Sequence, residues 1–458
     1  MSVSQGISRS MTGGFKELVL LFIPLAAVAF SNCAYLVIEK LFLAHLATID
    51  LEAAINAAYA WQIFQGFCIA LAMMAQVYVG RCCGALDFKA IGVGIWQFIW
   101  FSLLSTFLTL PMGILYGYFY FRNTEIESVV WPYYSFLLAI TFLFPLTIAL
   151  TSFYVGQGKT RLVFWATLLS QIAKVGIASI LILGWRDWIP PMGLIGGAIS
   201  TLIAQGGLCL VLFAVFLSSK YREKCDTWNW RWRPQFCLEC LYPGLMRAIG
   251  RVITFACWAS IAYLMSSRGG DYLLILSVGG TFFLFFQFLS EAIYQAQVTV
   301  VSHILGSCQY FYLKRAYYSA ILLVTLLVGI IGLPLLMAPL SIFECLFPGV
   351  MLTEDAIRNV FFGVWVCCIF FSYSFIPIGH VFAFKDAHFF LFMGVFNWIN
   401  GYLLMYVALE KMKMAADQFW LVLSLMHACT ALCYYLRMRW LERKWVPIPG
   451  IGPDPNLC

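Results

Sequence analysis

The hydrophobic and polar positions of this chain alternate on a long scale, with extended apolar runs separated only by short polar stretches. The runs lie near residues 17–45, 54–80, 91–121, 128–156, 160–184, 192–217, 238–266, 272–302, 316–346, 356–384, 388–410 and 416–440. About 20 consecutive apolar residues are enough for an α-helix to cross the hydrocarbon core of a bilayer. The pattern therefore predicts an all-α integral membrane protein with about twelve transmembrane helices.

The composition supports the membrane assignment. Hydrophobic residues make up 62% of the 458 positions and charged residues 11%, and the mean hydropathy is +0.87. A soluble domain carries about 25% charged residues, so a surface made from this chain needs lipid to cover it. The net charge of +7 is dispersed over short loops, which is not the pattern of a nucleic-acid-binding surface. The polar segment Met1–Lys16 lacks a small-residue cleavage site, so we expect the first apolar run to be retained.

A polar seam divides the chain near its middle. The longest polar stretch, from Lys220 to Arg233, separates the sixth run from the seventh and mixes arginine with tryptophan. This composition suits a segment in the cytoplasmic headgroup region of a membrane. The predicted domains are an N-terminal segment (1–16), a six-helix bundle (17–217), a linker (218–237), a second six-helix bundle (238–440) and a C-terminal tail (441–458).

The charges of the loops predict the orientation of the chain. With the N-terminus inside, eighteen basic residues fall on the inner side: Arg9, Lys16, Arg81, Lys89, Lys159, Arg161, Lys220, Arg222, Lys224, Arg231, Arg233, Lys314, Arg315, Lys385, Arg437, Arg439, Arg443 and Lys444. Six fall on the outer side: Arg122, Arg186, Arg268, Arg358, Lys411 and Lys413. Because basic residues are retained on the cytoplasmic side, both termini are predicted to be cytoplasmic.

The two halves of the chain resemble each other. Three features of the first half recur in order in the second, at offsets of 219 to 227 residues: Pro24 as Pro243, 79–84 as 301–306, and 156–161 as 383–388. Six helices in each half, an even number, make the repeats parallel. Repeated halves with a site at their interface are typical of secondary transporters.

Four stretches carry a resemblance to a known family. They are Pro24 followed fifteen residues later by Glu39, the exit of helix 2 at 76–87, the loop after helix 4 at 156–161, and the start of helix 6 at 191–201. In this order and at these helix ends, they resemble the multidrug and toxic compound extrusion (MATE) family, within the wider multidrug/oligosaccharidyl-lipid/polysaccharide exporter superfamily. The resemblance covers residues from about 15 to 440.

The resemblance implies a fold, an activity and some departures. It implies a V-shaped pair of six-helix bundles and export of amphipathic organic cations, coupled to inward flow of H⁺ or Na⁺. The family's carboxylate early in helix 7 falls here on Arg251, and the aspartate of many members in helix 10 falls near Phe371. Helix 5 carries Lys174 and Ala178 where members often have asparagine. The second bundle therefore lacks the usual acids, which leaves open whether it holds an ion site.

Charged residues at membrane depth are the first candidates for function, and there are six: Glu39, Lys40, Lys174, Arg247, Arg251 and Glu291. Each costs about 2.5–3.5 kcal/mol at a helix centre, so they should face a wet cavity or one another. Glu39 is the candidate coupling acid, because a carboxylate in a semi-dry cavity holds a proton and can release it to Na⁺ or a cationic substrate. Alternatively, Glu39 neutralises Lys40 or Lys174 as a structural pair.

In the first half, Lys174 is the candidate partner of Glu39, and a lysine that snorkels to the edge of its helix is the alternative. Gln65 and Gln76 on helix 2 are predicted to line the cavity as hydrogen-bond partners. Tyr35 offers an aromatic face that could hold a cationic ligand.

In the second half, Gln287, Glu291 and Gln295 share one face of helix 8 at positions i, i+4 and i+8. Arg251 on helix 7 is expected to form a buried ion pair with Glu291, and a second coupling site is the alternative. His380 is expected to be a structural histidine, with a proton relay as the alternative.

Missing motifs limit the function classes. The chain has no Walker-type Gly-x-x-x-x-Gly-Lys, no His-Glu-x-x-His and no Gly-x-Ser-x-Gly, so we expect no enzyme activity, no cofactor and no bound metal other than a Na⁺ at Glu39. We predict ion-coupled (H⁺ or Na⁺) antiport of amphipathic or cationic organic compounds by a monomer in the bacterial cytoplasmic (inner) membrane, with no nucleic-acid partner. The alternative is a flippase for a lipid-linked saccharide or another anionic lipid precursor, which the deep cations would suit.

Overall fold

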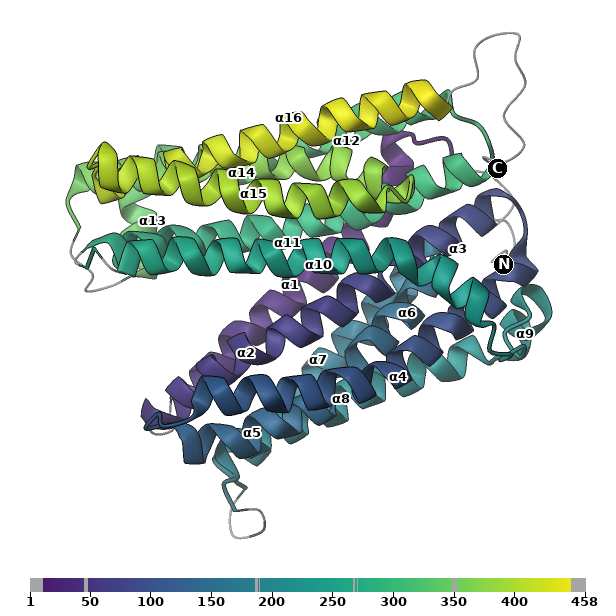
Figure 1. The fold of residues 1–458 in the computed structure, drawn as a ribbon, viewed down its shortest axis with the longest axis horizontal. Helices are drawn as coiled ribbons and strands as arrows, with labels where there is room; N and C mark the ends of the chain where they lie inside the picture. The colour runs from purple at the N-terminus through teal and green to yellow at the C-terminus, as the bar shows by residue number, and fades with distance from the viewer. Residues whose placement is uncertain are drawn as a thin grey trace. The chain divides into compact units, whose positions relative to one another are not determined.

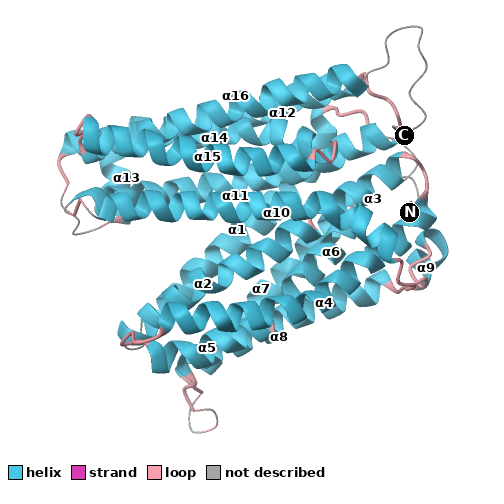
Figure 2. Cartoon of the chain, viewed as in Figure 1, coloured by secondary structure: helices cyan, strands magenta, loops and turns pink. Residues whose placement is uncertain are grey.

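The computed structural model describes residues 11–44, 48–185, 188, 190–266, 268–269, 271–347 and 352–445. Every regular element among these residues is a helix, and none of them lies in a strand (Figure 2). Twelve of the described segments are long and apolar enough to cross a membrane. The predicted all-α fold with twelve membrane spans is confirmed, and the chain is a multi-pass membrane protein.

The chain forms two compact units, and α1 and α10 each pass from one unit to the other. Unit 1 comprises Met1–Ala26 and Ile253–Cys458, and unit 2 comprises Ala27–Val252. The boundary in α1 falls two residues after Pro24, which lies inside that helix and cannot donate a backbone hydrogen bond. The domain ranges expected from the sequence stay predictions.

Unit 2 contains the second to sixth spans, with the second part of the first span and the first part of the seventh, and Figure 1 draws it in purple to teal. Its helices are the second part of α1 (Phe15–Ala44), α2 (Thr48–Ala72), α3 (Met74–Gly84), α4 (Phe88–Phe121), α5 (Glu127–Ala139), α6 (Leu143–Gly156), α7 (Thr160–Leu183), α8 (Gly193–Phe216), α9 (Ser219–Cys225) and the first part of α10 (Pro234–Ser266). Two spans are interrupted, because α2 and α3 share one and α5 and α6 share another.

Unit 1 contains the remaining spans. Besides the parts of α1 and α10 it has α11 (Asp271–Gly306), α12 (Tyr312–Met337), α13 (Pro339–Leu346), α14 (Glu354–Ala383), α15 (Ala387–Tyr406), the π-helical turn η1 (Val407–Lys411), the 3₁₀ turn η2 (Ala416–Gln418) and α16 (Phe419–Trp445). Helix α14 is central in this unit, since it packs against α11, α12 and α16.

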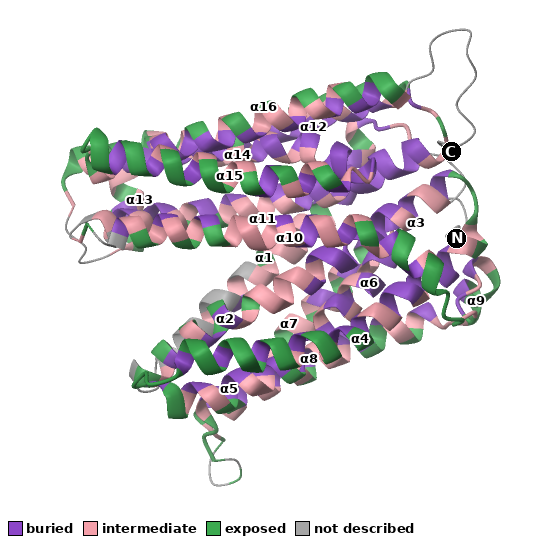
Figure 3. Ribbon diagram, viewed as in Figure 1, coloured by how far each residue is buried: buried purple, intermediate pink, exposed green. Residues whose placement is uncertain are grey.

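Small residues let the helices of each unit approach closely, as is usual where helices pack within a bilayer. In unit 2, a Cβ added at Gly117 of α4 would collide with Tyr134 of α5. In unit 1, Gly279 of α11 gives room to Trp420 of α16, which is fully buried and donates its indole N–H to Ile275 O at 3.2 Å. Large apolar side chains are exposed instead along the outer faces of α4, α8 and α16, where lipid is expected (Figure 3).

The seventh span begins slightly earlier than the apolar run that predicted it. Helix α10 begins at Pro234 rather than near residue 238. Proline is favoured in the first turn of a helix, because the N–H that it lacks would have no intrahelical partner there. Earlier in the same connection, residues Ser219–Cys225 form the short helix α9, which the hydrophobic pattern did not predict because it is not an apolar run.

Candidate functional site

A charged contact joins α1 and α7 inside unit 2. The ammonium Nζ of Lys174 lies 3.6 Å from the centroid of the Tyr35 ring. Tyr35 is buried, and Lys174 is half-buried. A cation over an aromatic face gains about 0.5–2 kcal/mol, more when both groups are removed from water. Two residues that the sequence analysis selected independently are thus brought together.

A second polar contact lies one helical turn earlier on the same two helices. The Nε2 of Gln171 donates a hydrogen bond of 2.6 Å to Oδ1 of Asn32. Asn32 precedes Tyr35 by three residues and Gln171 precedes Lys174 by three, so the two contacts follow one another in the same order on both helices. Helices α1 and α7 therefore run parallel here, as two odd-numbered spans must in the predicted topology.

Glu39 lies within α1, four residues beyond Tyr35 and seven beyond Asn32. Positions separated by three, four or seven residues share one face of an α-helix. The backbone therefore places Glu39 on the face of α1 that carries both contacts to α7. Its side chain is outside the described residues, so the predicted approach of Lys174 to Glu39 stays a prediction. We refer to Asn32, Tyr35, Glu39, Gln171 and Lys174 as the α1–α7 cluster.

The two glutamines predicted on the second span have different surroundings. Gln65 is half-buried on α2. Gln76 is buried on α3, where its backbone carbonyl lies against Gly156 of α6: a Cβ on that glycine would be 3.2 Å from the oxygen. Gln76 therefore packs between helices within unit 2.

Arg247 has a structural role at the break between α2 and α3. It is buried on the part of α10 that belongs to unit 2, and its Nη1 donates to Ala70 O at 3.4 Å and lies 3.6 Å from Met73 Sδ. Gly244, one turn earlier, allows this approach, since a Cβ there would be 3.0 Å from atoms of α2 and α3. The last carbonyls of a helix lack intrahelical donors, and a cation near them is favoured by the helix dipole.

The candidates of the eighth span lie on α11 in unit 1. Gln287, Glu291 and Gln295 are all half-buried, as expected for one helix face. Arg251 is half-buried on the part of α10 that belongs to unit 2. The predicted pair of Arg251 and Glu291 would join the two units and stays a prediction.

His380 lies in a buried polar group within unit 1. Its Nδ1 is 3.1 Å from Ile376 O on its own helix and 3.4 Å from Nε2 of Gln297 on α11. Gln297 also donates to Ala316 O on α12 at 3.3 Å. These contacts join α11, α12 and α14, and the structural role expected for His380 stays a prediction.

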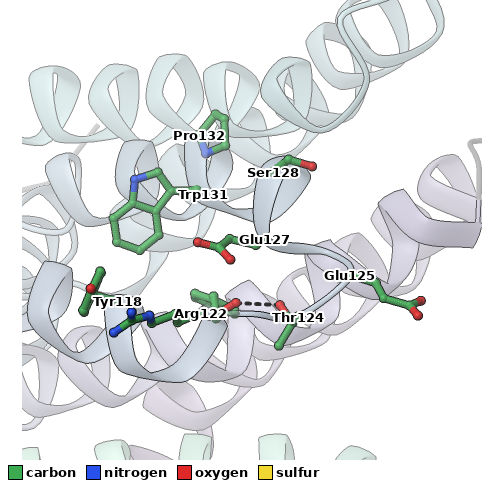
Figure 4. Close-up of a pocket in the computed structure, with 10 residues that line it drawn as sticks. Tyr118, Arg122, Thr124, Glu125, Glu127, Ser128, Trp131 and Pro132 are labelled. Atoms are coloured by element: carbon green, nitrogen blue, oxygen red, sulfur yellow. Dashed lines mark hydrogen bonds between the residues drawn. The ribbon is translucent and has the colours of Figure 1, made fainter.

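A surface pocket of about 650 Å³ lies at the α4–α5 end of unit 2, away from the α1–α7 cluster. Figure 4 shows the lining side chains, among them Arg122, Glu127 and Trp131, with Glu125 pointing away from the rest. The guanidinium of Arg122 lies 5.2 Å from the centroid of the Tyr118 ring. The side chains come from one loop and the adjoining helix ends, so the pocket belongs to the α4–α5 connection. Among the described residues, no three His, Cys, Asp or Glu side chains are grouped to hold a metal ion.

Comparison with solved structures places this geometry in context. A multidrug resistance MATE family transporter of the MOP superfamily, solved in an outward-facing conformation, superimposes with a TM-score of 0.83 at 14% identity, over 97% of this chain and 99% of that one. The fold is that of the MATE transporters. A MATE in its straight conformation gives a TM-score of 0.83 at 16% identity, over 97% and 99% of the two chains.

A third similar structure is described as having a binding pocket of reverse polarity. It is a MOP superfamily transporter from Pyrococcus furiosus, with a TM-score of 0.82 at 15% identity over 97% of this chain and 99% of that one, in which reverse polarity of the binding pocket suggests a different function. No protein-family model and no curated protein sequence matches the chain. The MATE-type resemblance read from the sequence is thus confirmed for the fold.

Sequence reasoning missed Asn32 as a member of the cluster and the role of Arg247. Asn32 carried a usable signal, because it lies three residues before Tyr35 and seven before Glu39, on one face of an apolar helix. Arg247 had none, since the break between α2 and α3 that it contacts follows no proline and lies in an apolar run.

Proposed function

We propose that this chain is a secondary active transporter of the MATE type, which exports amphipathic organic compounds in exchange for H⁺ or Na⁺. It would act as a monomer in a cytoplasmic membrane, with both termini inside and without chemical conversion of the substrate. The MATE fold over nearly the whole chain supports this class. The observation that carries the mechanism is the contact of Lys174 with Tyr35, one helical turn from Glu39.

In the proposed cycle, Glu39 is the coupling acid and Lys174 is a cation built into the protein. The ammonium occupies the aromatic face of Tyr35, the surface that would otherwise hold a cationic substrate. A carboxylate one turn away can be neutralised by a proton, by Na⁺, by Lys174 or by the substrate. Because all of these cations compete for the carboxylate, and Lys174 and the substrate also compete for the ring, binding of one releases another, which is the requirement for exchange.

The test is transport of a fluorescent organic cation by purified protein in liposomes, under an imposed pH or Na⁺ gradient. Glu39→Gln should abolish gradient-driven transport while leaving folded protein in the membrane. Glu52→Gln, which neutralises an exposed carboxylate on α2, is the matched control and should transport normally. Normal transport by Glu39→Gln would remove this residue from the mechanism.

Substitution of Lys174 distinguishes a cationic from an anionic substrate. If its ammonium competes with a cationic substrate for Tyr35, Lys174→Gln should lower KM for that cation about 5-fold, the equivalent of about 1 kcal/mol of cation–π energy. A flippase for an anionic lipid precursor is the second candidate, since the cations Lys174 and Arg251 of unit 2 would suit an anionic headgroup. In that case Lys174→Gln should weaken substrate binding, and neither gradient should drive transport of the organic cation.

A further inference from the structure

The segment that follows α8 is fixed to unit 2 at several points. Trp96 of α4 donates its indole N–H to Thr227 O at 2.8 Å, and Trp100, one turn later, donates to Trp230 O at 3.0 Å. Between them, Gln97 is fully buried and forms two hydrogen bonds to the backbone of the segment: Nε2 donates to Arg231 O at 2.9 Å, and Oε1 accepts from the N–H of Arg233 at 3.0 Å. We call residues 218–233 the linker strap.

Other contacts hold the start of the strap. A Cβ at Gly92 of α4 would collide with the carbonyl oxygens of Cys225 and Asp226, so this glycine permits the close approach of the strap to α4. At α9, Tyr221 is buried and its hydroxyl accepts a hydrogen bond of 3.0 Å from Nζ of Lys159. The strap is therefore an ordered layer on the end of unit 2, although it connects two spans and is polar in composition.

The outward side of this ordered strap is aromatic and basic. Trp228, Trp230 and Trp232 are exposed by 54%, 60% and 46%, although indole rings are rarely left to water without a partner. The strap carries five basic residues, Lys220, Arg222, Lys224, Arg231 and Arg233, against two acidic ones, Glu223 and Asp226, which gives a net charge of +3.

Its aromatic and basic groups are also close to each other. The guanidinium of Arg222 lies 4.9 Å from the centroid of the Trp228 ring, and the side chains of Arg231 and Arg233 are exposed beside the tryptophans. Tryptophan is enriched at the level of lipid headgroups, and clusters of basic residues next to membrane spans bind anionic lipids. Backbone contacts hold the strap, so its side chains are available for a partner.

We propose that the linker strap is a binding site for anionic phospholipids. The indole rings lie at the headgroup level of the adjacent leaflet, and the guanidinium groups of Arg231 and Arg233 bind the lipid phosphates. The hydrogen bonds to α4 hold the strap in place before lipid arrives, so little conformational entropy is lost when lipid binds.

The test is native mass spectrometry of the purified full chain in detergent, titrated with phosphatidylglycerol or with phosphatidylcholine of the same acyl chains. The wild-type protein should bind phosphatidylglycerol more tightly. Arg231→Gln/Arg233→Gln should weaken the tightest phosphatidylglycerol binding about 30-fold and leave phosphatidylcholine binding unchanged. Neither side chain forms part of the hydrogen bonds to Gln97, which use backbone atoms, so the variant should fold normally.

The matched control removes the same number of exposed cations from unit 1. Lys314→Gln/Arg443→Gln should bind phosphatidylglycerol like the wild type. Arg231→Lys/Arg233→Lys should retain most of the binding, which separates loss of charge from loss of structure. Equal binding of the two lipids by the wild type, or equal losses in the two Gln variants, would refute the proposal.

Discussion

Replacing Gln97 by leucine tests whether this one side chain holds the linker strap on unit 2. Gln97 is fully buried on α4, and leucine has a similar volume, so the packing of α4 should be preserved. The change removes the donor to Arg231 O and the acceptor for Arg233 N–H. An unsatisfied buried backbone group costs about 1–3 kcal/mol. Because both groups can recover water when the strap opens, we take the lower limit for each, about 2 kcal/mol in total.

This loss should appear as local opening rather than as global unfolding. A reduction of about 2 kcal/mol in the free energy of opening corresponds to about 30-fold faster exchange of amide hydrogens. Hydrogen–deuterium exchange with mass spectrometry should show this acceleration in peptides covering 226–233 and not in peptides from α11 or α14. Trypsin should also cut faster after Arg231, a bond within the strap.

A matched substitution controls for the loss of a glutamine. Gln62 is exposed on α2 in the same unit, and Gln62→Leu should leave exchange in the strap at the wild-type rate. If Gln97→Leu exchanged in 226–233 no faster than Gln62→Leu, the hydrogen bonds of Gln97 would not determine the stability of the strap.

Two further substitutions test single contacts. Arg247→Leu leaves the carbonyl of Ala70 without its charged donor, so it should destabilise the protein by about 2 kcal/mol, and an unchanged thermal midpoint in detergent would contradict this role. Burial lowers the pKa of Lys159 to about 8, so the folded protein binds fewer protons than the unfolded chain between pH 8 and the ordinary lysine pKa. The thermal midpoint of the wild type minus that of Lys159→Met should therefore rise between pH 7.5 and pH 9.5. A difference that does not change with pH would show that folding does not lower the pKa of Lys159.

The α1–α7 cluster shows how far residue types alone lead toward a site. Lys174, Tyr35 and Glu39 could be selected because charged and aromatic residues are costly or specialised at membrane depth. The pairing of Lys174 with Tyr35 could not be predicted, since it depends on which of the other helices lies beside α1.

The linker strap shows the opposite case. Its Trp and Arg content indicated the headgroup region, but the sequence did not indicate that Gln97 holds its backbone. That contact joins residues more than 130 positions apart. A glutamine in an apolar helix could equally line a cavity or form buried hydrogen bonds to another segment.

The sequence by itself determined that the chain is helical, lies in lipid and crosses the bilayer about twelve times. These properties follow from the length and hydropathy of local segments, because each span must satisfy its own backbone hydrogen bonds in a solvent that offers none. Only the tertiary structure decided that Lys174 lies over Tyr35, that Arg247 binds the end of α2, and that the linker is fixed to α4. Contacts between helices depend on side-chain shape and on neighbours distant in the sequence, which hydropathy does not encode.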